Sequence, residues 1–249
     1  MPTKENKELL IMLPAFNEEG SIGTFLDKLN TENLSDVADI LVINDGSTDD
    51  TSNIAKSKGA RVITHIYNLG YGCALQTGYK FAVRYGYDYV IQIDSDGQHD
   101  SCNIKAIYKE LKNTDNPPDI VIGSRFFQNS KSFPISWAKR VTIGFFRYVI
   151  RKSTKQIVLD PTSGLQGLNK RAFLYYSYYN NFDHEYPDAN MIIQTLLNDY
   201  IIKEVPAVMH LRETGTSMHS GLKPIMYVMK MMLETLIVIA REKLARRKK

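Results

Sequence analysis

The feature that most constrains this fold is an apolar run that ends in carboxylates, at residues 88–100. The run up to Ile93 is β-branched, aromatic or aliphatic, which is typical of a strand buried on both faces. Asp94 and Asp96 follow at once, with the amide of Gln98 two positions further on. Two acids this close repel one another unless a positive charge neutralises them. Their oxygens suit a hard divalent cation, which would in turn hold phosphates.

Other interpretations of these acids are open, of which the simplest is a polar turn that caps the strand. A calcium loop of the EF-hand kind requires Gly at its sixth position and Glu at its twelfth, where this chain has His99 and Lys105. A phosphohydrolase of the haloacid dehalogenase type also places Asp-x-Asp-Gly after a buried strand and uses the first Asp as a nucleophile. That family carries the motif near its N-terminus, whereas Asp94 follows three apparent βα units.

The rest of the chain alternates strands and helices. Apolar runs predict strands at 9–13, 40–43, 61–64 and 120–122, and Pro14 is expected to end the first of them. Helical spacing of apolar residues predicts helices between the strands. This alternation predicts a parallel sheet covered by helices, and ligands bind at the carboxyl ends of such strands. The loop at 14–18, Asp45 and the acids at 94–98 all fall there.

Length and composition limit what else the chain contains. With 249 residues, 43% of them hydrophobic, it can bury the core of one α/β domain with an appendage. The glycine signatures of dinucleotide oxidoreductases and P-loop hydrolases are absent. Cys73 and Cys102 lack metal-type spacing, and Met1–Glu8 is polar, so we expect a cytoplasmic protein without zinc. No window has the roughly 20 apolar residues of a membrane span, so any membrane contact is expected to be peripheral.

Positive charge is concentrated in two stretches. Six of the residues at 241–249 are basic, and residues 120–159 contain no acid. The basic residues of the second stretch are Arg125, Lys131, Lys139, Arg140, Arg147, Arg151, Lys152 and Lys155. Amphipathic helices are expected at 134–151 and from Pro224 onward. Such helices suit an anionic membrane surface, at about 1 kcal/mol per Lys or Arg.

Other environments would also accommodate this charge and the last helix. The basic tail, Arg246-Arg247-Lys248-Lys249, could instead be an ordinary solvated chain end. The Met-rich last helix could instead pack against the domain or against a small integral membrane protein. Nucleic acid is not expected as a partner, because no recognised binding module accompanies the charge.

Six motifs together resemble one known family. They are Leu13-Pro14-Ala15-Phe16-Asn17-Glu18, Val42-Ile43-Asn44-Asp45-Gly46-Ser47, Asp94-Ser95-Asp96-Gly97-Gln98-His99, Gly123-Ser124-Arg125-Phe126, Thr162-Ser163-Gly164 and Arg212-x-x-Gly215-x-Ser217. The pattern is similar to that of the inverting family 2 glycosyltransferases with the GT-A fold, and most like the dolichyl- and polyprenyl-phosphate sugar synthases. It implies a Rossmann-like α/β fold with a mostly parallel central sheet covered by helices. The GT-A domain would span 1–218, with a basic membrane-facing helical insertion at about 131–155, and an amphipathic helix with a basic tail would follow at 219–249.

The resemblance also implies a role for each site residue. Asp94, Asp96 and Gln98 would bind Mg²⁺ or Mn²⁺ across the diphosphate of a nucleotide sugar. The donor site would consist of Pro14, Phe16, Glu18, Asp45, Ser95 and Arg212, with Asp45 on the base and Arg212 on the leaving diphosphate. Family members often have Tyr in place of Phe16 and Asp in place of Asn44. The ring can still stack on the base, but a hydroxyl contact is lost.

The catalytic residues implied in this way are Asp96, Arg125 and Asp188. Arg125 would hold a lipid phosphate in a fork-like contact, and such an acceptor is already an oxyanion that needs no strong base. Members with a hydroxyl acceptor use a late acid to take the proton, for which Glu185 and Asp188 are the candidates. Their segment departs from the Glu-Asp pair of those enzymes, which favours the lipid phosphate.

The expected function is therefore inverting transfer of a sugar from a nucleoside diphosphate, with UDP expected, to polyprenyl phosphate. The reaction would take place at the inner face of the cell membrane and supply cell-wall or other surface glycans. Transfer to a sugar hydroxyl of a lipid-linked or cell-wall glycan is the alternative within the class. The phosphohydrolase and a catalytically silent membrane adaptor are alternatives from other classes.

Overall fold

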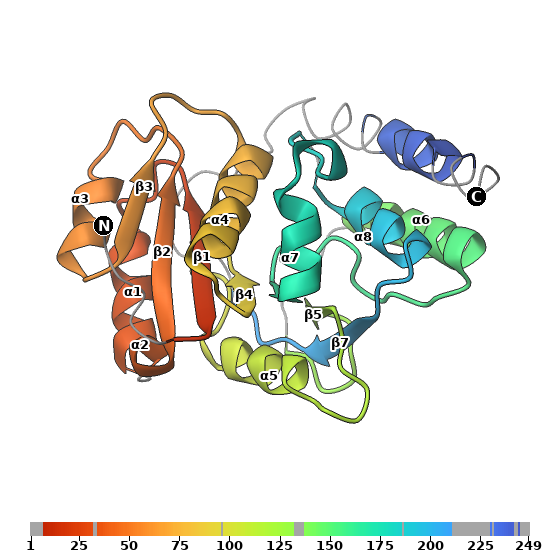
Figure 1. The fold of residues 1–249 in the computed structure, drawn as a ribbon, viewed down its shortest axis with the longest axis horizontal. Coiled ribbons are helices and arrows are strands. Elements are labelled where there is room, and N and C mark those ends of the chain that lie inside the picture. The colour runs from red at the N-terminus through yellow and green to blue at the C-terminus, as the bar shows by residue number, and fades with distance from the viewer. Residues whose placement is uncertain are drawn as a thin grey trace.

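The computed structural model describes residues 7–31, 34–95, 97–131, 137–185, 187–210, 230, 232–241 and 244. Their strands form one mixed sheet in the order β3-β2-β1-β4-β6-β5-β7 (Figure 1). The strands are β1 (Leu9–Ala15), β2 (Ala38–Asn44), β3 (Arg61–Thr64), β4 (Tyr89–Gln92), β5 (Ile120–Ser124), β6 (Gln166–Asn169) and β7 (Ile202–Pro206). Only β6 runs against the others, because it pairs antiparallel with both β4 and β5.

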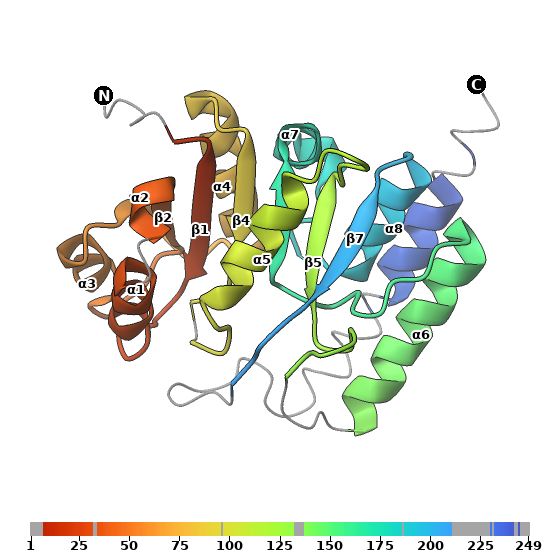
Figure 2. The ribbon, with the colours of Figure 1, turned by 90° about the horizontal axis from the view of Figure 1, so that it is seen from below.

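Helices cover both faces of this sheet (Figures 1 and 2). One face packs against α1 (Ile22–Thr31), α2 (Leu34–Val37), α3 (Thr51–Ser57) and α5 (Cys102–Leu111). The other packs against α4 (Tyr71–Tyr85), α7 (Lys170–Ser177) and α8 (Ala189–Leu197). Apolar side chains of the strands alternate between the two cores, so the predicted mostly parallel, doubly covered sheet is confirmed.

The first strand does not end at Pro14 as predicted, because β1 continues to Ala15. Pro14 has no N–H, and the backbone of this residue faces β4, which ends opposite Met12. No residue of β4 lies opposite Pro14, so the missing N–H costs the sheet no hydrogen bond. The carbonyl of Pro14 instead accepts a hydrogen bond from the Ser95 hydroxyl at 2.9 Å.

The helix predicted at 134–151 is α6 (Trp137–Thr154), and its predicted start at 134 lies outside the described residues. Its inner side chains are buried, and Phe146 packs against Ala189 of α8 and Met232. Residues 232–241 form a further helix beside α6 and α8 (Figures 1 and 2). Pro224, where this helix was expected to begin, and the tail at 245–249 lie outside the described residues. Within the described part of the chain, no helix is long and apolar enough to cross a membrane.

Candidate active site

The loops after β1 and β2 are joined at the carboxyl edge of the sheet. The Asn17 amide N–H donates to Ser47 Oγ at 3.0 Å, and Asn17 Oδ1 accepts from the Thr48 amide at 2.9 Å. The Glu18 amide donates to Thr51 Oγ1 at 2.8 Å, while its carboxylate accepts from the Ser21 hydroxyl at 2.6 Å. Phe16 is left 38% exposed on this edge, so its ring is available for stacking.

Asp45 is buried at the end of β2 and holds the loop that follows β3. Its carboxylate accepts from the amides of Leu69 and Gly70 at 2.9 and 2.8 Å and contacts His65 Nδ1 at 2.6 Å. Gly46 has φ of +72°, and a Cβ there would lie 2.5 Å from the Tyr67 carbonyl carbon, so only glycine fits. Asp45 therefore organises the backbone of this loop, and contact with a nucleotide base stays a prediction.

Asp94 lies directly beyond β4 with a side chain that is 35% exposed. Its Oδ1 accepts from the Tyr71 hydroxyl at 3.0 Å, and its Oδ2 lies 4.0 Å from His99 Nε2. A Cβ on Gly164 would approach Asp94 Oδ2 to 2.6 Å, so glycine at that position makes room for the carboxylate. Asp96 lies outside the described residues.

Ser95 and Gln98 lie in the same loop as Asp94. The Ser95 side chain is buried and joins this loop to β1, so it faces the protein interior rather than the predicted donor. The Gln98 carbonyl accepts from the His210 amide at 2.7 Å, and the Asp100 amide donates to the Val208 carbonyl at 3.2 Å. The segment 207–210 thus holds the predicted metal loop in place. Arg212, two residues further on, lies outside the described residues.

Arg125 forms a bidentate ion pair that was not predicted from the sequence. Its Nε and Nη2 donate to the two oxygens of Asp160 at 2.7 and 2.6 Å, and its amide also donates to Asp160. Asp160 is fully buried, and Nη2 of Arg125 also reaches Thr162 Oγ1 at 2.9 Å. The guanidinium fork predicted to hold the acceptor phosphate is therefore already engaged with a carboxylate.

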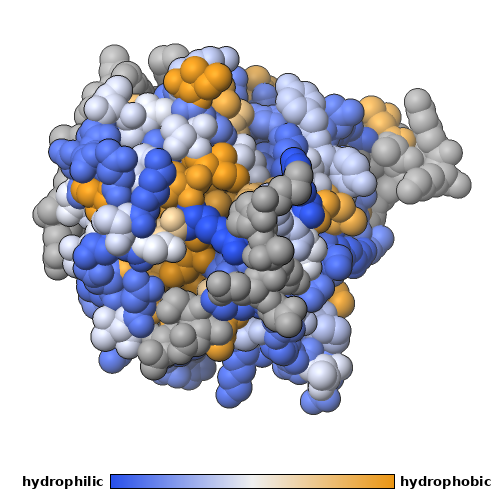
Figure 3. Space-filling model, turned by 60° about the vertical axis from the view of Figure 1, so that its left-hand side comes forward, coloured by the Kyte–Doolittle hydropathy of each residue, from blue (hydrophilic) through white to orange (hydrophobic). Residues whose placement is uncertain are grey.

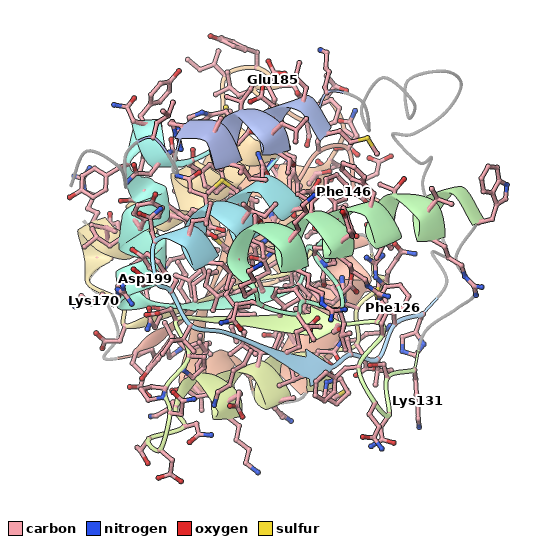
Figure 4. All side chains as sticks on the ribbon, turned by 90° about the vertical axis from the view of Figure 1, so that its right-hand side faces the viewer. Phe126, Lys131, Phe146, Lys170, Glu185 and Asp199 are labelled. Carbon is pink, nitrogen blue, oxygen red and sulfur yellow. The ribbon has the colours of Figure 1, made fainter. Side chains whose placement is uncertain are left out.

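Asp188 lies at the start of α8, and its charge acts on Arg125. Burial works to lower the pKa of Arg125, but the hydrogen bond and charge of Asp160, with Asp188 and Asp94, raise it. Burial and then the charges of Asp94 and Asp188 raise the pKa of Tyr71 well above its ordinary value, so Tyr71 remains a hydrogen-bond donor. The charges of Asp94 and Asp188 thus act on both Arg125 and Tyr71. Glu185 is exposed and lies away from Phe126 (Figure 4), whereas the charge of Asp188 acts on Arg125. A role of Asp188 as a base stays a prediction.

Tyr71 and Asp160 were not among the predicted site residues. Asp160 had a sequence signal, because it is the residue that ends the acid-free stretch in which Arg125 lies. An isolated acid that directly follows a stretch rich in cations is a good candidate for an ion pair with one of them. Tyr71 had no comparable signal, because its contact with Asp94 depends on how α4 packs across the sheet.

Two of the predicted ligands at this edge have the chemistry that a hard divalent cation requires. Asp94 has a carboxylate that is 35% exposed, and Gln98, in the same loop, has an amide oxygen. Among the described residues, no group of three or more His, Cys, Asp or Glu side chains is placed to hold a metal. The third predicted ligand, Asp96, is not among them.

A second concave feature lies away from this edge, between β3 and α4. The groove has a volume of about 570 Å³ and an apolar floor that includes Val62, Ile63 and Phe81. Arg61, Lys80 and Arg84 line its rim, and Figure 3 shows this side, where apolar surface lies in a hollow between hydrophilic side chains. The groove contains none of the predicted site residues.

Comparison with known proteins identifies a family and relatives for this chain. A family model described as "Glycosyl transferase family 2" matches residues 10–176. An uncharacterized protein of Methanocaldococcus jannaschii is 34% identical over 66% of this chain and 66% of its own length. The UDP-N-acetylglucosamine–dolichyl-phosphate N-acetylglucosaminyltransferase of Methanococcus voltae is 28% identical over 67% of this chain and 71% of its own. The chain thus spans about two thirds of the length of these curated relatives.

Solved structures show the same fold. Glucosyl-3-phosphoglycerate synthase of Mycobacterium tuberculosis, in complex with Mn²⁺ and UDP-glucose, superposes with a TM-score of 0.67. The superposition covers 94% of this chain and 79% of that enzyme at 21% sequence identity. The GT-A-like arrangement of sheet and helices is therefore confirmed.

Proposed function

The chain belongs to glycosyl transferase family 2. We propose that it transfers a sugar from a nucleoside-diphosphate sugar, with UDP as the expected nucleotide, to polyprenyl phosphate, and that the anomeric carbon is inverted. The observation that carries the proposal is that Asp94 and Arg125 follow the carboxyl ends of β4 and β5, and that the charges of Asp94 and Asp188 act on Arg125. The name of the M. voltae relative adds a dolichyl-phosphate acceptor and a UDP-linked donor. The phosphohydrolase alternative fails, because the family match assigns the chain to the glycosyltransferases.

The donor would bind across the loops after β1, β2 and β4. Phe16 offers a partly exposed ring for the base, and the Asp45-anchored loop fixes Leu69 and Gly70 at the start of α4. Asp94 and Gln98, with Asp96, would hold Mg²⁺ or Mn²⁺. When bound, such an ion neutralises the diphosphate as it leaves. The hydroxyl of Tyr71 orients the Asp94 carboxylate for this purpose.

A phosphate acceptor requires a cation and no strong base. Its oxygen is anionic at neutral pH, so attack on the anomeric carbon needs orientation and charge neutralisation rather than proton removal. Arg125 supplies positive charge at the site, although its Nε and Nη2 already donate to Asp160. The position of Asp188 supports the second candidate, transfer to a sugar hydroxyl, because a carboxylate beside Asp94 and Arg125 could accept the hydroxyl proton.

We place the acceptor side of the enzyme against an anionic membrane surface. The outer face of α6 exposes Trp137, Val141 and Tyr148 by 78, 61 and 61%. The helix at 232–241 exposes Leu233 and Leu236 by 59 and 55%. Basic residues flank these apolar side chains, which is the composition of an interfacial helix. Peripheral attachment at the inner face of the membrane and a small membrane partner remain parts of this proposal.

The deciding experiment gives the enzyme UDP-[¹⁴C]sugars with Mn²⁺ and either polyprenyl phosphate or a lipid-linked glycan. Transfer to polyprenyl phosphate forms a glycosyl phosphate, which partitions into organic solvent and releases its sugar in mild acid. Transfer to a hydroxyl forms a glycosidic bond that survives the same treatment, so the label stays in an oligosaccharide even where the acid cleaves that glycan from its lipid. We expect an acid-labile lipid product that Asp94→Asn abolishes. An acid-stable product lost in Asp188→Asn would establish the hydroxyl acceptor instead.

A further inference from the structure

Arg125 is engaged with Asp160, and α6 brings a second arginine, Arg147, close to it. The Arg147 guanidinium lies over the ring of Phe126, 4.5 Å from its centroid. The Arg125 guanidinium lies 5.7 Å from the centroid of the same ring. Arg147 also reaches the loop that carries Asp160, because its Nε donates to the Leu159 carbonyl at 2.6 Å. The two arginines therefore converge on one ring and one loop.

The charge of Arg147 is not compensated in the way that Arg125 is. None of the ion pairs between lysine or arginine and carboxylates in the described part of the chain includes Arg147. Its Nη2 is buried and has no hydrogen-bond acceptor among the described residues. A buried guanidinium N–H without an acceptor is unfavourable and indicates a position where water or a ligand oxygen binds.

The place of Arg147 fits a lipid that carries a phosphate. Phe126 follows directly after Arg125, which is close enough to Asp94 and Asp188 for their charges to raise its pKa. On its other side, α6 presents the exposed apolar residues Trp137, Val141 and Tyr148. Figure 4 shows Phe126 beside α6. A phosphate at Arg147 would thus lie between the lipid-facing side of α6 and the reacting group.

We propose that Arg147, stacked on Phe126, binds the phosphate of the lipid acceptor, while Arg125 is fixed by Asp160 and positions the adjoining loop. This inference rests on the proposed function and adds the residue that recognises the acceptor. The ligand class is a phosphomonoester on an apolar chain, and the same chemistry is offered by the headgroups of bulk anionic phospholipids. If the site recognises the acceptor, Arg147 will matter for binding of the prenyl phosphate itself. If it recognises bulk headgroups, Arg147 will matter equally for binding of phospholipid vesicles that contain no prenyl phosphate.

The test measures binding of citronellyl phosphate to the full chain by titration calorimetry without donor. Arg147→Met keeps the apolar stem on Phe126 but removes the charge, and we expect at least tenfold weaker binding. Arg84→Met, at an exposed position of α4, is the matched control and should change affinity less than twofold. Arg147→Lys should recover part of the loss, because it restores the charge without the planar fork. Circular dichroism and a thermal melt establish that each variant is folded.

The outcomes separate this inference from the proposed function. Unchanged citronellyl phosphate affinity in folded Arg147→Met overturns the inference, while lipid product from the wild-type enzyme leaves the proposed function standing. A wild-type enzyme that neither binds the prenyl phosphate nor glycosylates it overturns both. A third arm uses phosphatidylglycerol vesicles without prenyl phosphate. If Arg147→Met weakens vesicle binding as much as citronellyl phosphate binding, the site recognises bulk headgroups and the assignment to the acceptor is wrong.

Discussion

Asp160 and Arg125 form a buried pair whose two members depend on one another. The Arg125 side chain is 14% exposed and that of Asp160 is fully buried, so neither charge is well solvated. Removing one partner of such a pair leaves the other uncompensated, which typically costs about 3 to 5 kcal/mol. Loss of activity in an Arg125 variant therefore has two possible causes, lost folding stability and lost contact with substrate.

We expect Arg125→Ala to lower the free energy of unfolding by about 3 kcal/mol or more for this reason. Urea unfolding followed by circular dichroism measures the change. The double variant Arg125→Met/Asp160→Leu removes both charges and should recover much of the loss. An Arg125→Ala protein that unfolds at the wild-type urea concentration would show instead that Arg125 acts mainly on the substrate.

Tyr71 holds one oxygen of Asp94 through its hydroxyl at 3.0 Å. Partners that orient a metal ligand in this way typically contribute about 10- to 100-fold to metal affinity. We expect Tyr71→Phe to weaken Mn²⁺ binding by about tenfold, measured by electron paramagnetic resonance of free Mn²⁺. Tyr175→Phe, on α7, serves as the control and should leave Mn²⁺ affinity unchanged. Equal affinities in wild type and Tyr71→Phe would reduce Tyr71 to a packing residue.

At the scale of elements, α6 combines a buried face with an apolar outer face. Ile143, Phe146 and Ile150 are buried, whereas Val141 and Tyr148 are each 61% exposed. Large apolar side chains exposed on a helix that also carries Arg151 and Lys152 are typical of helices that lie in a membrane interface. The helix at 232–241 extends this exposed apolar surface.

Val141→Glu/Tyr148→Glu should therefore weaken sedimentation with anionic vesicles while the fold is retained. The substitutions remove apolar area and add charges that anionic lipids repel. Val83→Glu, at an exposed position of α4, is the control and should sediment as wild type. Raising the salt concentration should weaken binding of the wild type, because exposed charges are screened. Equal sedimentation of all three proteins would contradict a membrane role for α6.

At the scale of the whole molecule, the donor and its ion would join loops from several strands. A ligand that binds only the folded state adds about 2.7 kcal/mol of stability at 100 times its dissociation constant. We expect UDP-sugars with Mn²⁺ to raise the melting temperature more than GDP- or dTDP-sugars do, and excess EDTA to cancel the shift. A larger shift with a GDP-sugar would reassign the nucleotide, and a shift of full size in EDTA would argue against the ion.

The strands that end in polar loops, and the sheet edge at which those loops meet, could be predicted from the amino-acid sequence alone. Burial of both strand faces leaves a local signature in Leu9–Leu13 or Tyr89–Ile93, and helical spacing is equally local, so these elements and the position of Asp94 were predictable. The family motifs added roles for residues on that edge. The exact end of β1 was missed, because whether Pro14 ends a strand depends on where the neighbouring β4 stops.

Which side chains pair with one another across the site is visible only in the folded structure. Arg125 and Asp160 are 35 positions apart along the chain, and they meet because antiparallel β6 inserts between β4 and β5. Tyr71 reaches Asp94, and Arg147 reaches Phe126, only through the packing of α4 and α6. Such contacts depend on strand order and helix packing, which arise from the sum of many distant interactions and leave no local periodic signal. The charges of the site could be listed from the sequence, but which of them are neutralised within the protein and which can bind a ligand was settled by the fold.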